Sequence, residues 1–147
     1  MYYTIGEMAQ KINVPPSTLR YYDKEGLLPN VARSSGGRRM FQDSDLEWLS
    51  VLTCLKETGM PIREIKRFLD LGDQAIAPRL ELIQKQRQSV LDQIEQLSQA
   101  LHILDYKQWY YQTALEAGTC AVHQSLGPED IPKKFRSLVE SWRKQEH

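Results

Sequence analysis

Residues 17–29 of the chain read STLRYYDKEGLLP. They follow Pro15 and Pro16, and proline is favoured in the first turn of a helix. Gly26 is typical of the residue that ends a helix, and Pro29 cannot continue one. The stretch therefore predicts a short helix that begins near Ser17 and stops at Gly26.

A second short helix is predicted directly before this one. Thr4 and Glu7 have the spacing of a capping box, in which each side chain bonds to the backbone N–H of the other residue. Asn13 tolerates the left-handed backbone that often ends a helix. The apolar residues between them recur at helical spacing and are Ile5, Met8, Ala9 and Ile12. Two short helices joined by a tight turn form a helix-turn-helix.

The second helix of this pair carries side chains suited to DNA. They are Ser17, Thr18, Arg20, Tyr21 and Tyr22. Arginine can bind a guanine edge through two hydrogen bonds, and hydroxyl groups can donate to phosphate. Leu19 and one of the tyrosines are instead candidates for the core. Arg20 has no apolar role, so we expect it to contact DNA.

A basic hairpin is predicted next. In residues 31–41, VARSSGGRRMF, two strand-capable stretches flank a Ser-Gly-Gly turn signal. The hairpin carries Arg33, Arg38 and Arg39, whose forked guanidinium groups match phosphate and fit a narrow minor groove. Such a charge run is otherwise an ordinary solvated loop. Beside a helix-turn-helix, we favour contact with DNA.

Two more helices complete a head of residues 1–74. Asp43 is expected to cap the first, which runs from Ser44 to about Thr58. The second begins at Pro61 and ends at Gly72. Its apolar stripe consists of Ile62, Ile65, Phe68 and Leu69.

Residues 78–117 predict a long helix with a heptad pattern. The a positions are Leu80, Arg87, Ile94 and Leu101, and the d positions are Ile83, Val90, Leu97 and Leu104. Such a stripe predicts a coiled coil, and a helix this long needs a second chain to bury it. Arg87 either sets the register at some cost in stability or extends its charge outward.

Residues 118–147 form a tail. Spacing predicts a short amphipathic helix whose apolar face is Phe135, Leu138, Val139 and Trp142. The tail follows an aromatic run, Trp109, Tyr110 and Tyr111. These three residues either line a small pocket or, as we favour, pack against the C-terminal helix or the partner's head.

Composition narrows the classes of protein. The 147 residues carry no net charge, but residues 1–40 hold six basic and three acidic side chains, a one-sided footprint that fits nucleic acid. No apolar run reaches the roughly 20 residues of a membrane span, and the N-terminus has no signal-peptide pattern. We expect a cytoplasmic protein with two reduced cysteines and no membrane partner. No catalytic motif is present, so we expect no enzyme.

Three stretches, residues 4–9, 17–29 and 37–41, resemble the MerR family of bacterial regulators. The dense resemblance covers residues 4–72, and the long helix resembles that family's dimerisation helix. It implies a mainly α fold with a winged helix-turn-helix head (1–74), an antiparallel coiled-coil helix (78–117) and a tail (118–147). It also implies a homodimer that bends and untwists a near-palindromic promoter with an overlong spacer, so that RNA polymerase can engage. The cost of deforming DNA, a few kcal/mol, lets an effector gate the step.

The resemblance also carries over site residues. By position, the family's DNA contacts fall on Ser17, Thr18, Arg20, Tyr22, Arg38 and Arg39. Lys56, Arg63 and Lys66 lie in the region that supplies a second wing. The implied partners are double-stranded promoter DNA, a second copy of the chain and, indirectly, RNA polymerase, and no cofactor is expected.

Only a few residues are candidates for sensing the effector. The region around Cys54 resembles the aldehyde- and electrophile-responsive branch (NmlR- or AdhR-like), which implies a reactive thiol there. Glu57 disfavours thiolate, so an activating cation must come from another segment or from the partner chain. The alternative is a buried structural cysteine. Cys120 and His123 form half of a metal-binding pattern. A further alternative is therefore a regulator that senses a metal or a small ligand near these two residues. In a third alternative, the chain is a coiled-coil protein-interaction module that does not bind DNA.

Overall fold

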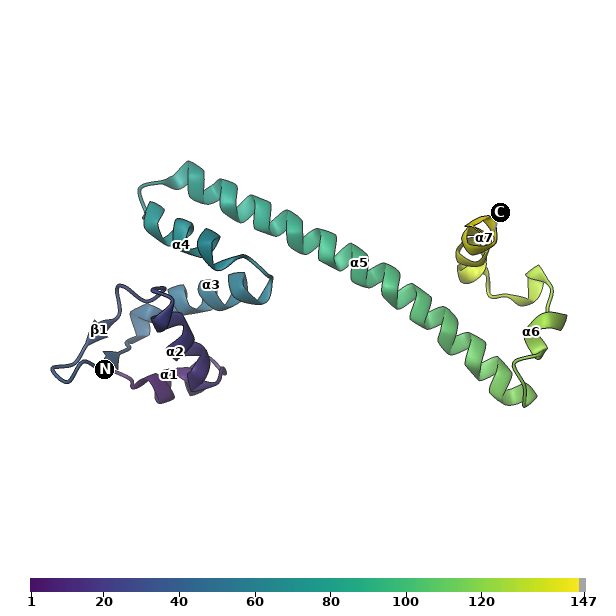
Figure 1. Ribbon diagram of the computed structural model, residues 1–147, viewed down its shortest axis with the longest axis horizontal. Coiled ribbons are helices and arrows are strands. Elements are labelled where there is room, and N and C mark those ends of the chain that lie inside the picture. The colour runs from purple at the N-terminus through teal and green to yellow at the C-terminus, as the bar shows by residue number, and fades with distance from the viewer. Residues whose placement is uncertain (146–147) are drawn as a thin grey trace. The chain divides into compact units, whose positions relative to one another are not determined.

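The computed structural model describes residues 1–145 and is mainly helical, as predicted. Figure 1 shows short helices at the N-terminal end, one long helix, and short helices after it. The chain divides into two compact units, Met1–Val90 and a second unit that begins at Leu91.

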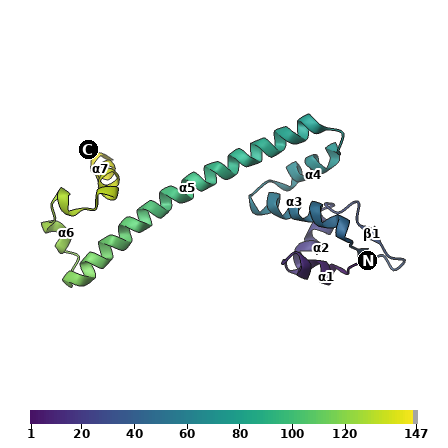
Figure 2. The same ribbon diagram turned by 180° about the vertical axis from the view of Figure 1, so that it is seen from behind.

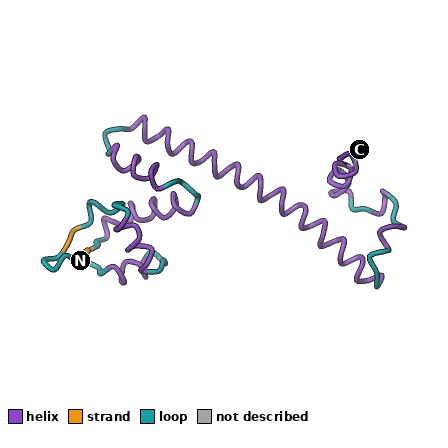
Figure 3. The backbone as a smooth tube through the Cα atoms, in the orientation of Figure 1, coloured by secondary structure: helices purple, strands orange, loops and turns teal. Residues whose placement is uncertain are grey.

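The predicted helix-turn-helix is present (Figure 3). Helix α1 spans Ile5–Lys11 and α2 spans Pro16–Lys24. Thr4 caps α1, because its Oγ1 accepts a hydrogen bond from the backbone N–H of Glu7 at 3.2 Å. Asn13 has φ 59°, the left-handed conformation expected at this turn.

The predicted hairpin is also present, with strands of only two residues each. Strand β1 (Ala32–Arg33) pairs antiparallel with β2 (Arg39–Met40), so that Arg33 lies opposite Arg39. Gly37 has φ 80° in the turn, which favours glycine. The base of the hairpin is tied to the N-terminus by a bridge between Tyr3 and Phe41.

Helix α3 (Leu46–Glu57) and helix α4 (Ile62–Leu71) complete the head. The prediction that Asp43 caps α3 is wrong. A short 3-10 turn, Asp43–Asp45, precedes the helix, and Gln42 is its extended N-cap residue. The backbone N–H of Gln42 donates to Asp45 Oδ2 at 2.9 Å, so Gln42 and Asp45 form a capping box at this turn and Asp43 is not the cap.

Helix α5 runs over Ile76–Ala117, two residues longer at its start than predicted. Its beginning is fixed to the head by Arg79. The guanidinium lies 4.5 Å from the Phe68 ring centroid, and its Nε donates to the Phe68 carbonyl at 3.1 Å. Phe68 in turn stacks on Trp48, with the rings 5° from parallel. Figure 2 shows α4 beside the start of α5.

The second unit contains the end of α5, a short helix α6 (Val122–Ser125), two 3-10 turns (Pro128–Asp130 and Lys133–Phe135) and α7 (Arg136–Gln145). Phe135 is buried, and its ring lies 5.6 Å from that of Tyr106. Trp109 packs against Phe135, which belongs to the predicted face of the C-terminal helix, so the favoured interpretation is confirmed for this residue. Tyr110 instead stacks on His123. Tyr111 is 58% exposed and does not share this packing.

No helix within residues 1–145 combines the length and the apolar character that a membrane span requires.

Trp48 gives a test of the head's core. Its indole Nε1 donates to the Leu27 carbonyl at 2.8 Å. Trp48→Phe keeps most of the ring packing but loses this bond, and we expect a loss of about 1–2 kcal/mol in the free energy of unfolding. Urea unfolding at one fixed protein concentration measures it, because dimerisation would make stability depend on concentration. An unchanged free energy of unfolding would contradict this role of the indole.

Candidate nucleic-acid interface

Helix α2 presents a polar face and buries the opposite one. Ser17, Arg20 and Tyr21 are exposed, and Thr18 is half-buried. Leu19 and Tyr22 lie in the core of the head, with Tyr22 only 3% exposed. Burial raises the pKa of the Tyr22 phenol. Tyr22 is therefore the core tyrosine that the sequence left open, and α2 offers Arg20 and Tyr21 to a ligand.

The three hairpin arginines differ in their surroundings. Arg38 is exposed beside the turn. The Arg33 side chain is 52% exposed, and its Nη1 donates to the Gly37 carbonyl at 2.8 Å. The Arg39 side chain is only 14% exposed, because its guanidinium turns inward to Asp23 and the Val31 carbonyl. Arg33 and Arg38 are therefore accessible to a ligand, and Arg39 is not.

The recognition helix and the hairpin meet at one polar cleft of about 450 Å³. Four arginines line it, together with one carboxylate and the start of α1. The lining residues are Thr4, Ile5, Gly6, Arg20, Asp23, Arg33, Gly37, Arg38 and Arg39. The cleft thus brings the predicted basic residues of two separate segments together, an arrangement that suits a phosphate backbone.

The expected second-wing residues lie outside this cleft. Lys56 is on α3, with its Nζ 6.0 Å from the centroid of the Tyr21 ring. Arg63 and Lys66 are on α4, the first exposed and the second half-buried. Lys56 thereby adds a cation beside the exposed tyrosine of α2.

Sequence reasoning missed Asp23. Its carboxylate accepts hydrogen bonds from Arg39 and lies 3.6 Å from Arg33. The sequence held a partial signal, because a hairpin with three arginines needs a counter-charge and two acidic residues, Asp23 and Glu25, lie shortly before it. Spacing does not say which of the two faces the hairpin.

Comparison with known proteins agrees with this geometry. The sequence matches the profile described as MerR HTH family regulatory protein over residues 3–71 and the profile described as MerR, DNA binding over residues 46–106. An HTH-type transcriptional regulator of Haemophilus influenzae is 48% identical over 122 residues, which are 81% of this chain and 90% of the relative. AdhR of Bacillus subtilis is 28% identical over 91 residues, 60% of this chain and 65% of AdhR.

A solved structure gives the same result. HiNmlR, described as a MerR family regulator lacking the sensor domain and bound to promoter DNA, is 46% identical and has a TM-score of 0.74. The match covers 83% of this chain and 99% of HiNmlR. The chain belongs to the MerR family. It is therefore a DNA-binding transcriptional regulator and not an enzyme.

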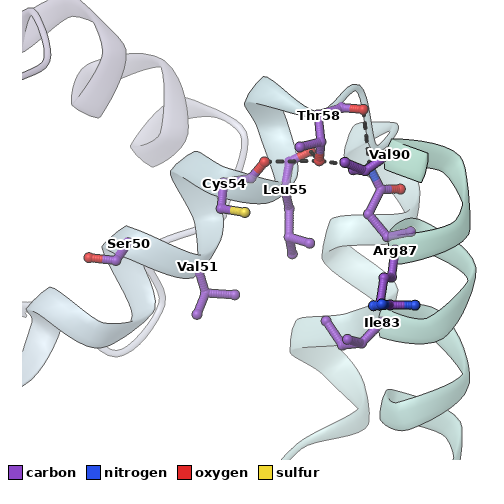
Figure 4. A pocket seen from close by; sticks show the side chains of 9 residues that line it. Ser50, Val51, Cys54, Leu55, Thr58, Ile83, Arg87 and Val90 are labelled. Carbon is purple, nitrogen blue, oxygen red and sulfur yellow. Dashed lines mark hydrogen bonds between the residues drawn. The ribbon is translucent and has the colours of Figure 1, made fainter. Parts of the chain in front are cut away.

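Cys54 of this MerR regulator lies on the solvent side of α3, opposite the buried residues Leu52 and Leu55. The alternative of a buried structural cysteine is wrong, because the periodicity of α3 turns this position away from the core. Figure 4 shows the side chain at a groove of about 500 Å³ between α3 and the first part of α5. The groove is lined by Ser50, Val51, Cys54, Leu55, Thr58, Ile83, Gln86, Arg87 and Val90.

The groove also contains one basic side chain, which comes from another segment of the chain. Arg87 from α5 lines the same groove as the thiol. The two walls are also joined, since the Gln86 amide donates to Thr58 Oγ1 at 2.7 Å and to the Thr58 carbonyl at 3.1 Å. Cys54 therefore lies where the head meets the long helix.

The alternative sensing position, Cys120 with His123, has little to bind a metal. His123 Nε2 is 2.9 Å from the Tyr110 carbonyl, and its ring stacks on Tyr110 with centroids 3.7 Å apart. Cys120 is exposed. Within residues 1–145, no three His, Cys, Asp or Glu side chains gather closely enough to hold a metal ion.

Arg20 and Arg38 give a paired test of the cleft. Arg20→Ala should weaken operator binding and relax its sequence preference, because a base contact is worth about 1–3 kcal/mol of discrimination. Arg38→Ala should weaken binding to all sequences alike and reduce the salt slope by about one, the effect of one lost phosphate contact. Fluorescence anisotropy with operator and scrambled duplexes across a salt series measures both. Two variants that bind operator like the wild type would refute this placement of DNA.

Proposed function

We propose that this MerR regulator binds a near-palindromic promoter operator as a homodimer and controls transcription by distorting the promoter, with Cys54 as the electrophile-responsive switch. The observation that supports the dimer most directly is the apolar stripe of α5. Leu97 is 70% exposed and Leu104 is 64% exposed, and neither is covered within one chain. A helix with such a stripe is stabilised by a partner.

Each exposed side chain of the stripe would be buried by a partner helix. Besides these two, the exposed members at a and d positions are Leu80, Ile83, Ile94 and Leu101. Full burial of one such side chain is worth about 1.5–3 kcal/mol. Several buried on each chain would outweigh the cost of association, which is estimated at 4–15 kcal/mol.

The length of α5 supports action on one deformed promoter. Its 42 residues, at about 1.5 Å each, span roughly 60 Å. An antiparallel pair would hold one head at each end, so that the two recognition helices have a fixed separation. Two heads reach successive major grooves of a duplex only if their spacing matches its helical repeat. Bending or untwisting a spacer that does not match costs a few kcal/mol, which a switch can supply or withhold.

Cys54 is placed for such a switch. Its thiol is exposed at an apolar groove whose two walls belong to the head and to α5. With an aldehyde, the sulfur would bond to the carbonyl carbon, the thiol proton would leave, and the carbonyl oxygen would take up a proton. The resulting hemithioacetal adds volume between α3 and α5. The added group would shift the head relative to the helix that sets its spacing.

The dimer is tested by Leu97→Glu. A charge at an exposed d position costs nothing in the monomer but must be desolvated in the seam, so we expect mainly monomer and at least tenfold weaker operator binding. Sedimentation velocity and anisotropy measure the two effects. Gln96→Glu adds the same charge one residue away, outside the a and d positions, and should leave the dimer intact. If Leu97→Glu stayed dimeric, the seam would be elsewhere.

The switch is tested by Cys54→Ser. We expect this variant to bind operator normally and to lose most aldehyde-induced transcription, because the serine hydroxyl is a far weaker nucleophile. Transcription from the promoter in vitro, with intact-mass measurement of the adduct, checks both. Cys120→Ser is the matched control and should respond like the wild type. Full induction of the Cys54→Ser variant would remove Cys54 from the mechanism.

A further inference from the structure

Asp23 is the one acidic side chain among the residues that line the DNA-facing cleft. A carboxylate on a surface that binds a polyanion opposes binding through its own charge. Arg20, Arg33, Arg38 and Arg39 surround it in the cleft. Its position therefore needs a reason other than contact with DNA.

The geometry supplies one. Arg39 Nη2 lies 2.7 Å from Asp23 Oδ1, and Arg39 Nε donates to the same oxygen at 2.9 Å. The remaining arm of the guanidinium, Nη1, donates to the Val31 carbonyl at 2.7 Å. Arg39 thus ties strand β2 to helix α2 and to the loop before β1. With side chains 14% and 25% exposed, the pair is largely withdrawn from solvent.

The register of the hairpin explains why this tie is needed. Arg33 and Arg39 lie directly opposite each other in a ladder of two residue pairs. Like charges in that position are destabilising, and so short a ladder has little else to hold it. Asp23 Oδ1 is also 3.6 Å from Arg33 Nη2, so one carboxylate faces both arginines. The Arg33 side chain remains 52% exposed beside it.

We propose that Asp23 is a positioning residue of the DNA interface, acting through the wing arginines. Its carboxylate holds the Arg39 guanidinium inside the head, where Arg39 supports the hairpin. The same carboxylate fixes the orientation of Arg33, whose exposed N–H groups then bind a phosphate. This inference rests on the proposed placement of DNA on the cleft. Arg39 then contributes to binding without touching DNA, and the carboxylate strengthens the binding of a polyanion.

The sign of one mutational effect separates this role from simple electrostatics. Asp23→Asn removes a negative charge from the cleft, so charge alone would tighten operator binding and steepen its salt dependence. If Asp23 positions the arginines, the same change frees them, and binding must then restrict both side chains again. We expect about tenfold weaker binding and a salt slope reduced by about one, the share of the Arg33 phosphate contact.

The experiment measures operator affinity by anisotropy across a salt series for the full-length protein, with Glu7→Gln as the control. Glu7 is an exposed carboxylate on α1 of the same head, outside the residues that line the cleft. Glu7→Gln should leave affinity unchanged or slightly raise it. Active fractions are first counted by stoichiometric titration, and thermal melting tests whether each variant is folded, so that lost protein is not mistaken for lost affinity.

A double-mutant cycle then tests whether Asp23 acts through Arg33. Arg33→Ala should cost several-fold in the wild type and little in the Asp23→Asn background. Asp23→Glu, which restores the charge, should recover part of the affinity. Equal or tighter binding by Asp23→Asn, or a full Arg33→Ala effect in its presence, would overturn the proposal. A wild type that binds with no salt dependence would instead refute the placement of DNA itself.

Discussion

The apolar stripe of α5 is the constraint on which the other parts of this regulator depend. A helix of 42 residues has leucines that are 53–70% exposed along one face. One chain alone therefore does not bury this apolar stripe. The head does not need that seam, because its core of Met8, Leu19, Phe41, Leu52 and their neighbours is closed on itself. The stripe is therefore free to serve assembly, and the head is free to serve DNA.

These two tasks are coupled at the start of α5. On one side Arg79 seats on Phe68 and Trp48, and further along Gln86 binds Thr58. The groove that contains Cys54 shares Ile83, Arg87 and Val90 with the a and d positions of α5. A packed interface has discrete arrangements rather than a continuous range. Under the proposed switch, a group added in the groove would favour one of these arrangements over the other.

Much of this fold could be predicted because local rules and family pattern agree. Proline, glycine and Asn13 marked the helix ends, and heptad spacing marked α5. The error at Asp43 came from a 3-10 turn, which is held by hydrogen bonds between Gln42 and Asp45 and leaves no periodic signal. The exposure of Cys54 was open in the sequence, because it depends on which face of α3 meets the core. That Arg87 lines the same groove depends on the packing of α5 against α3, which sequence spacing does not give.

The arginines show the same limit for the site. Arg38 and Arg39 are adjacent and chemically identical, yet Arg38 lies just before β2 and Arg39 is the first residue of that strand. One is exposed beside the turn and the other binds Asp23. A basic cluster read from sequence therefore mixes side chains that are open to solvent with side chains that bind to other parts of the fold. The two kinds of arginine can be distinguished only when the partner of each charge is known. Here the partner of Arg39 is Asp23, a residue that a count of net charge would score against DNA binding.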